Sequence, residues 1–136
     1  MIYLDTSVLV SAFRTDDFSD ATLDWLATNP PFILSHWTLT EFSSAVGILM
    51  RQNYVSNADR MTVETDLDGW LKGRPLCDVS GDDVRAARAL VRDSETLRAG
   101  DALHLAVVVR HRLSLATFDR GMAAEAQRLG LEVVRP

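Results

Sequence analysis

Short apolar runs alternate with longer amphipathic segments along the whole chain, and this alternation limits the fold more than any other feature of the sequence. The longer segments have the spacing of helices, and the apolar runs have the length of strands. Strands that alternate with helical crossovers favour a parallel sheet covered on both faces. We therefore predict an α/β fold, a three-layer α/β/α sandwich around a central, mainly parallel sheet. The predicted strands are Ile2–Leu4, Phe32–Leu34, Leu76–Val79, Leu113–Thr117 and Glu132–Val134.

Capping residues set the expected helix boundaries. The run from Thr38 to Glu41 has the spacing of a capping box, which predicts a helix that extends to about Asn53. Gly73 and Gly130 are typical of residues that follow a helix C-terminus. The other expected helices begin near Thr6, Ser19, Ser56, Ser80, Asp101 and Arg120, and the last two end near His111 and Leu129.

Composition narrows the class of protein. A chain of 136 residues with 47% hydrophobic residues can bury the core of a single domain, which we expect to span residues 1–136. Cys77 is the only cysteine, so an internal disulfide is excluded and a reducing cytoplasm suits the chain. Apolar stretches such as Leu105–Val109 are much shorter than the ~20 residues that span a bilayer. We expect a cytoplasmic protein with no membrane attachment.

Four carboxylates are expected at the carboxyl edge of the sheet. Asp5 ends the first strand, Asp119 closely follows the strand that ends at Thr117, and Glu41 and Asp101 lie in the first turns of two helices. Alone, each is explained as a helix cap or as a charge that complements a helix dipole. Together on one edge they would repel each other unless a cation neutralised them, and carboxylate oxygens suit Mg²⁺ or Mn²⁺.

Hydroxyl groups accompany these acids. Thr6 and Ser7 directly follow Asp5, and Thr117 lies two residues before Asp119, so each could hold a carboxylate oxygen in a fixed orientation. For Thr6, simple helix capping is an equally good interpretation. His104 shares a helix face with Asp101 and could reach the site, although a hydrogen-bonded core histidine is the favoured interpretation.

Short motifs along the whole chain resemble one known family. Leu4–Leu9, Thr40-Glu41-Phe42, Gly100–Ala106 and Ala116–Arg120, in this order and at this total length, are similar to the PIN-domain ribonucleases, specifically the VapC toxins of bacterial toxin–antitoxin pairs. The last helix and strand, 126–133, also look like those of the family.

The resemblance implies an Mg²⁺-dependent endoribonuclease that acts on structured RNA. The metal-binding acids of the family correspond to Asp5, Glu41, Asp101 and Asp119 of this sequence, and all four are present. The resemblance also implies a homodimer and a cognate antitoxin that occupies a groove and the metal site. An apolar set on and near the third helix is either part of that groove or, for most members, core: Trp37, Phe42, Val46, Leu49, Met50 and Trp70.

RNA also requires basic residues, although the formal charge of −5 argues against binding by bulk electrostatics. Arg85, Arg88 and Arg92 share one helix face and are candidates for phosphate contacts, but a solvated face with nearby aspartates is the favoured interpretation. Arg98 is a further candidate because it lies close in sequence to Asp101.

Two alternative functions remain open from the sequence. A phosphatase of similar fold would use Asp5 as a nucleophile, but such sites commonly have a second acid two residues later, where this chain has Ser7. A non-catalytic binding protein would use the same acids only as helix caps.

Overall fold

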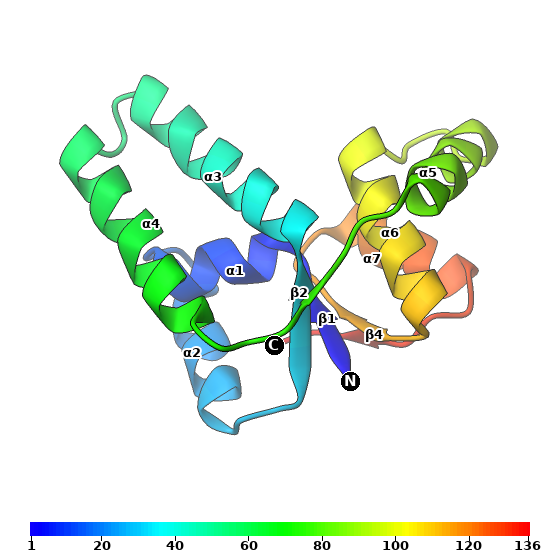
Figure 1. Ribbon diagram of the computed structural model, residues 1–136, viewed down its shortest axis with the longest axis horizontal. Coiled ribbons are helices and arrows are strands. Elements are labelled where there is room, and N and C mark those ends of the chain that lie inside the picture. The colour runs from blue at the N-terminus through cyan, green and yellow to red at the C-terminus, as the bar shows by residue number, and fades with distance from the viewer.

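A five-stranded, all-parallel sheet forms the centre of the computed structural model, which describes residues 1–136 (Figure 1). The strand order is β3-β2-β1-β4-β5, so β1 lies in the middle, with Ile2 opposite both Phe32 and Ser114. This confirms the predicted α/β architecture. The strands are β1 (Ile2–Leu4), β2 (Phe32–Ser35), β3 (Leu76–Cys77), β4 (Ser114–Ala116) and β5 (Val133–Val134).

Three strands are shorter than predicted because their neighbours are short. The edge strand β3 pairs only with β2, and β2 ends at Ser35, where the next helix begins. Cys77 is therefore the last residue of β3 that has a partner, although the sequence predicts a strand to Val79. Limited pairing with neighbouring strands also holds β4 and β5 to fewer residues than their apolar runs contain.

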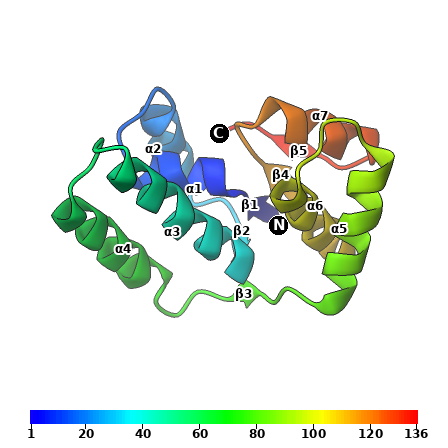
Figure 2. The same ribbon diagram turned by 90° about the horizontal axis from the view of Figure 1, so that it is seen from above.

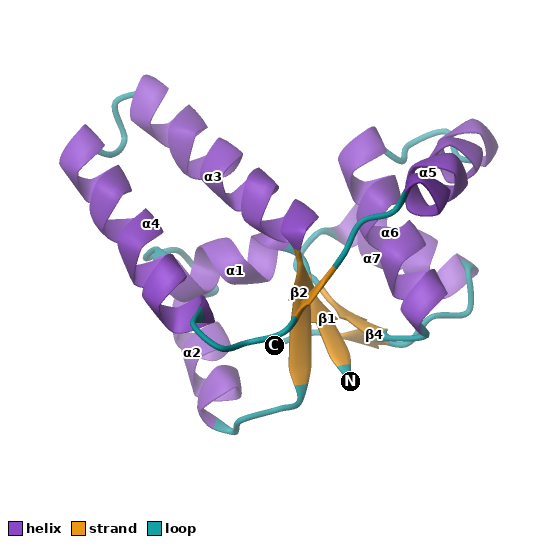
Figure 3. Cartoon of the chain, in the orientation of Figure 1, coloured by secondary structure: helices purple, strands orange, loops and turns teal.

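Helices cover both faces of the sheet in two groups (Figures 2 and 3). Successive side chains of β1 point to opposite faces. Tyr3 packs with residues of α5, α6 and α7, whereas Leu4 packs with residues of α1, α3 and α4. The helices are α1 (Thr6–Phe13), α2 (Ser19–Ala27), α3 (His36–Arg51), α4 (Asn57–Leu71), α5 (Gly81–Asp93), α6 (Ala99–His111) and α7 (Arg120–Arg128).

Helix α3 begins three residues earlier than predicted, and its capping box is a different one. Ser35 is the N-cap: its hydroxyl accepts from the Thr38 backbone N–H, and the Thr38 hydroxyl faces the Ser35 N–H. The prediction that Glu41 closes a box with Thr38 is therefore wrong, and Glu41 lies in the second turn. Helix α6 likewise begins at Ala99, before the predicted Asp101.

The glycines that follow two helices, and two predicted core residues of α3, lie as the sequence predicts. Gly73 and Gly130 follow α4 and α7 with φ of +79° and +77°, a left-handed conformation that glycine adopts without strain. In the apolar set on α3, Phe42 and Val46 are fully buried, which confirms the core interpretation for these two residues. None of the helices combines the length and the apolarity needed to cross a membrane.

Candidate functional site

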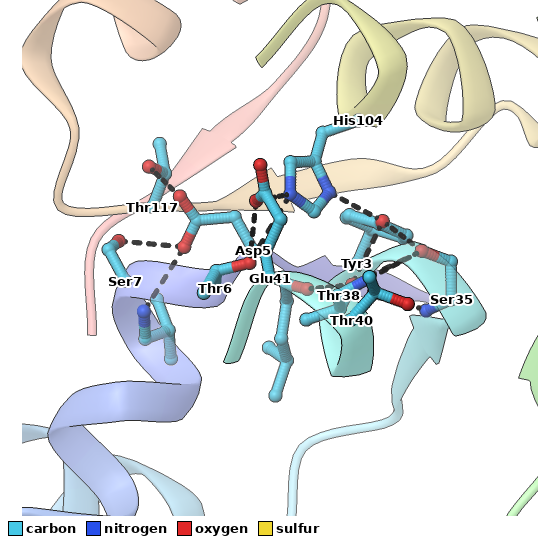
Figure 4. Close-up of polar contacts among 12 residues, drawn as sticks. Tyr3, Asp5, Thr6, Ser7, Ser35, Thr38, Thr40, Glu41, His104 and Thr117 are labelled. Atoms are coloured by element: carbon cyan, nitrogen blue, oxygen red, sulfur yellow. Dashed lines mark hydrogen bonds and ion pairs between the residues drawn. The ribbon is translucent and has the colours of Figure 1, made fainter. Parts of the chain in front are cut away.

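Asp5 lies at the carboxyl end of β1, buried and held by three donors (Figure 4). It is the N-cap of α1: its Oδ1 accepts from the Val8 backbone N–H at 3.1 Å and from the Ser7 hydroxyl at 2.7 Å. Its Oδ2 accepts from the Thr117 hydroxyl at 2.6 Å. Burial raises the pKa of Asp5 above its ordinary value, although these three hydrogen bonds act in the opposite direction.

Thr117 and Ser7 connect Asp5 to the segment that carries Asp119. The Thr117 oxygen accepts from the Asp119 backbone N–H at 2.9 Å, and the Ser7 oxygen accepts from the Phe118 N–H at 2.9 Å. The backbone N–H of Asp5 itself donates to Ala116 at the end of β4. Asp119 is exposed and caps α7 through the Met122 N–H. Pairing of β1 with β4 thus places two sequence-distant acids beside each other.

Glu41 is held by donors from two other elements. The Thr6 hydroxyl donates to its Oε2 at 2.9 Å, and His104 Nε2 lies 2.7 Å from the same oxygen. Thr6 therefore contacts Glu41 and not Asp5, although it directly follows Asp5 in the sequence. Burial raises the pKa of Glu41, but the hydrogen bond and charge of His104 and the hydrogen bond from Thr6 outweigh it and hold this pKa below its ordinary value.

His104 belongs to a buried polar network as well as to the site. Its side chain is only 1% exposed, and its Nδ1 lies 2.7 Å from the Tyr3 hydroxyl. That hydroxyl also contacts Ser35 at 2.6 Å and Thr38 at 3.0 Å. The sequence gives little sign of this role for Tyr3; a tyrosine in a short, otherwise apolar central strand is the one available signal, because a buried hydroxyl needs a partner.

Asp101 and Asp119 line one cavity of about 290 Å³, together with Arg98. Burial raises the pKa of Asp101, and the negative charges of Asp119 and Glu41 raise it further. The structure therefore gathers like charges around Asp101, as expected where a cation binds. Asp5, with its buried carboxylate, is linked to this cavity through Thr117.

The donor set fits a divalent metal ion, but the acids are not assembled around a preformed site. Carboxylate oxygens are the ligands that Mg²⁺ and Mn²⁺ prefer. No group of three or more histidine, cysteine, aspartate or glutamate side chains lies close enough to hold a metal ion. The carboxylates would have to move toward one another to share one.

The candidate phosphate-binding arginines do not form one basic patch. Arg85 pairs with Asp82 on its own helix, as a solvated face predicts. Arg88 and Arg92 line a separate, apolar cavity of about 410 Å³ with Trp37. Of the four candidates, only Arg98 lines the cavity of the acids.

Gly100, in the first turn of α6, was not singled out from the sequence as a functional residue. A Cβ atom at this position would collide with Glu41 Oε1, so glycine here lets the Glu41 carboxylate lie against the start of α6. Glycine is unfavourable within helices, and its presence at the start of a predicted helix is the signal that could have identified it.

The geometry also bears on the phosphatase alternative. Ser7, at the position where such sites have a second acid, donates to Asp5. The structure thus offers no support for a phosphorylated Asp5.

Comparison with known proteins identifies the family. Ribonuclease VapC35 of Mycobacterium tuberculosis is 30% identical over 149 aligned residues, which cover 100% of this chain and 97% of the relative. M. tuberculosis VapC20, described as a toxin that cleaves the sarcin-ricin loop, has the same fold, with a TM-score of 0.76, 22% identity and 100% of both chains covered. VapBC2 from Rickettsia felis, bound to promoter DNA, matches with a TM-score of 0.70 and 21% identity over 100% of this chain and 99% of that one. The family model described as "PIN domain" matches residues 2–127, and the chain belongs to this family.

Proposed function

We propose that this PIN-domain protein is a metal-dependent endoribonuclease of the VapC type, a toxin that a cognate antitoxin neutralises. The observation that carries the proposal is the gathering of Asp5, Glu41, Asp101 and Asp119 at one edge of the sheet, from β1, α3, α6 and the start of α7. The identity of 30% to a ribonuclease over the whole chain supports the same activity.

Each acid has a distinct part in this proposal. Asp5 would be the central metal ligand, Asp101 and Asp119 would complete the metal shell, and Glu41 would hold a metal-bound water or a second ion. Mg²⁺, which Mn²⁺ can replace, would lower the pKa of water and stabilise charge on the phosphodiester. Ser7 and Thr117 orient Asp5, and Thr6 orients Glu41, so that these carboxylates do not have to be ordered during the reaction.

The proposed substrate is structured RNA, and the proposed partner is an antitoxin. Similar solved structures include toxin–antitoxin complexes such as VapBC2, which supports a protein partner of that kind. Arg98, beside the acids, is the arginine best placed to meet an RNA phosphate. We further propose that residues 1–136 act as one nuclease domain, because a single sheet joins both groups of helices, and that the free toxin is a homodimer.

Cleavage of total RNA by the purified protein tests this function. Wild-type protein with Mg²⁺ should cleave, and a chelator should stop cleavage while the circular dichroism of the folded chain persists. Asp5→Asn should lose more than about 100-fold in rate, because loss even of residues that only orient ligands costs 10–100-fold. Asp17→Asn, at an exposed aspartate, is the matched control and should cleave normally.

Undiminished cleavage by Asp5→Asn, or cleavage that survives the chelator, would refute the metal-dependent mechanism. The non-catalytic alternative makes a different prediction, since a protein whose acids only cap helices should show no change in melting temperature when Mg²⁺ or Mn²⁺ is added.

A further inference from the structure

Glu41 is unusually constrained for a carboxylate at the edge of a site. Its side chain is 28% exposed, which would ordinarily leave it free to rotate. However, one oxygen, Oε2, is bound by Thr6 from α1 and by His104 from α6. The other oxygen, Oε1, lies against the backbone of Gly100, at the N-terminal turn of α6 that carries Asp101. Only Oε1 is therefore left to act on a ligand in the site.

The direction of the hydrogen bonds follows from what each group can donate. A carboxylate only accepts, so His104 Nε2 must carry the proton of the bond to Glu41. The other ring nitrogen, Nδ1, lies 2.7 Å from the Tyr3 hydroxyl, which can either donate to it or accept from it. Tyr3 and His104 are therefore hydrogen-bonded in either protonation state of the ring.

The hydroxyl groups at the buried end of this line of hydrogen bonds also have partners. The Tyr3 oxygen lies within hydrogen-bond distance of the Ser35 and Thr38 hydroxyls, and in each pair either group can donate. Tyr3, Ser35, Thr38 and His104 are almost completely buried, with exposures of 0–1%. A continuous line of hydrogen bonds thus runs from Ser35, at the buried carboxyl end of β2, through Tyr3 and His104 to Glu41 (Figure 4).

We propose that Tyr3 and His104 are positioning residues: the Tyr3 hydroxyl holds the His104 ring in place, and His104 then fixes Glu41 through Oε2, so that Glu41 presents Oε1 alone to the metal site. This proposal rests on the proposed metal-dependent function. It assigns Glu41 as a ligand through one oxygen, to the metal or to its bound water.

A double-mutant cycle on metal binding tests the proposal. The measured quantity is the affinity for Mn²⁺ alone, by calorimetric titration, in four proteins: wild type, His104→Leu, Glu41→Gln and the double variant. His104→Leu should weaken Mn²⁺ binding by about 10–100-fold when Glu41 is present and by no more than about 2-fold when Glu41 is replaced. His104→Gln, which retains a donor toward Glu41, should recover part of the loss. His111→Gln, at an exposed histidine of the same helix, is the matched control and should bind as wild type does.

Nitrogen NMR of the imidazole provides a readout that does not depend on activity. The ring-nitrogen shifts of His104 should change in Tyr3→Phe, which retains the aromatic ring but removes the hydroxyl. Tyr54→Phe, at an exposed tyrosine, should leave them unchanged. Unchanged His104 shifts in Tyr3→Phe, or an equal loss of Mn²⁺ affinity from His104→Leu with and without Glu41, would overturn the proposal.

These outcomes separate the positioning role from the nuclease function. A wild-type protein that shows the coupling in Mn²⁺ binding but cleaves no RNA would support the positioning pair and refute the ribonuclease. A protein that cleaves RNA with no coupling would refute the positioning pair alone.

Discussion

The Thr117 hydroxyl is the most sensitive point at which to perturb the site without removing an acid. It is 1% exposed, donates to Asp5 Oδ2 at 2.6 Å and accepts from the Asp119 N–H at 2.9 Å. Thr117→Val retains the shape of the side chain and removes both bonds. A hydrogen bond to a charged group contributes about 1.5–3 kcal/mol and a neutral one about 1 kcal/mol. Because Asp119 is exposed and water can replace the second partner, we expect a loss of about 1.5–3 kcal/mol in the free energy of unfolding at neutral pH.

The loss should depend on pH in a defined direction. Burial raises the pKa of Asp5 in the folded protein, so the folded state binds the proton more tightly than the unfolded state does. Stability therefore falls as pH rises from the ordinary aspartate pKa through the folded one. Removing the Thr117 donor raises the folded pKa further, which makes the destabilisation larger at neutral pH than in acid, where Asp5 is protonated in both states.

Urea denaturation of wild type, Thr117→Val and Thr117→Ser at neutral and acidic pH measures this effect. Thr117→Ser retains the hydroxyl and should be much closer to wild type than Thr117→Val is. If Thr117→Val differs from wild type by less than about 0.5 kcal/mol at neutral pH, the hydroxyl does not stabilise the Asp5 carboxylate and the reasoning is wrong.

Two further substitutions test other contacts. Gly100→Ala gains up to about 1 kcal/mol of helix propensity, but its Cβ displaces Glu41. We therefore expect about 10-fold weaker Mn²⁺ binding with little loss of thermal stability. Gly81→Ala, whose Cβ meets only ordinary contacts, is the control and should change neither quantity. Arg110→Gln breaks the ion pair with buried Asp83. Although burial raises the pKa of Asp83, Arg110 holds it below the ordinary value, so this stability is present at neutral pH and lost as pH falls through the folded pKa. Urea midpoints should show a loss of about 2–4 kcal/mol at neutral pH and little in acid; an equal loss at both would contradict the assignment.

The fold was predictable because its determinants are local and periodic. Alternating strands and helices, together with the handedness of crossovers, limit a chain of this length to few topologies. Boundaries were less predictable where two signals compete. Ser35 both ends β2 and caps α3, and since Thr38 follows at the spacing of a box, the chain has two possible starts for this helix only three residues apart. Packing decides between them, because the Ser35 and Thr38 hydroxyls are buried against Tyr3.

The candidate acids were predictable, whereas the contacts that orient them were not. Strand order places Asp5 next to the end of β4, and this follows from the parallel sheet. The pairing of Thr6 with Glu41 and of Tyr3 with His104 depends on how α3 and α6 meet above the sheet. These contacts join residues 35 and 101 positions apart, and a single sequence carries no local signal for them.

Helix capping and metal binding, which compete as explanations when each acid is considered alone, are compatible in this structure. Asp119 caps α7 with Oδ1, and the residue also lines the cavity that it shares with Asp101. Asp5 caps α1 with Oδ1, and its Oδ2 accepts a hydrogen bond from the Thr117 hydroxyl. Because the positive ends of α1 and α7 stabilise these carboxylates, the fold tolerates acidic residues here in the absence of a cation. The same caps fix the orientation of Asp5 and Asp119, so the movement that would bring the acids around one cation falls mainly on Glu41 and Asp101, which cap no helix.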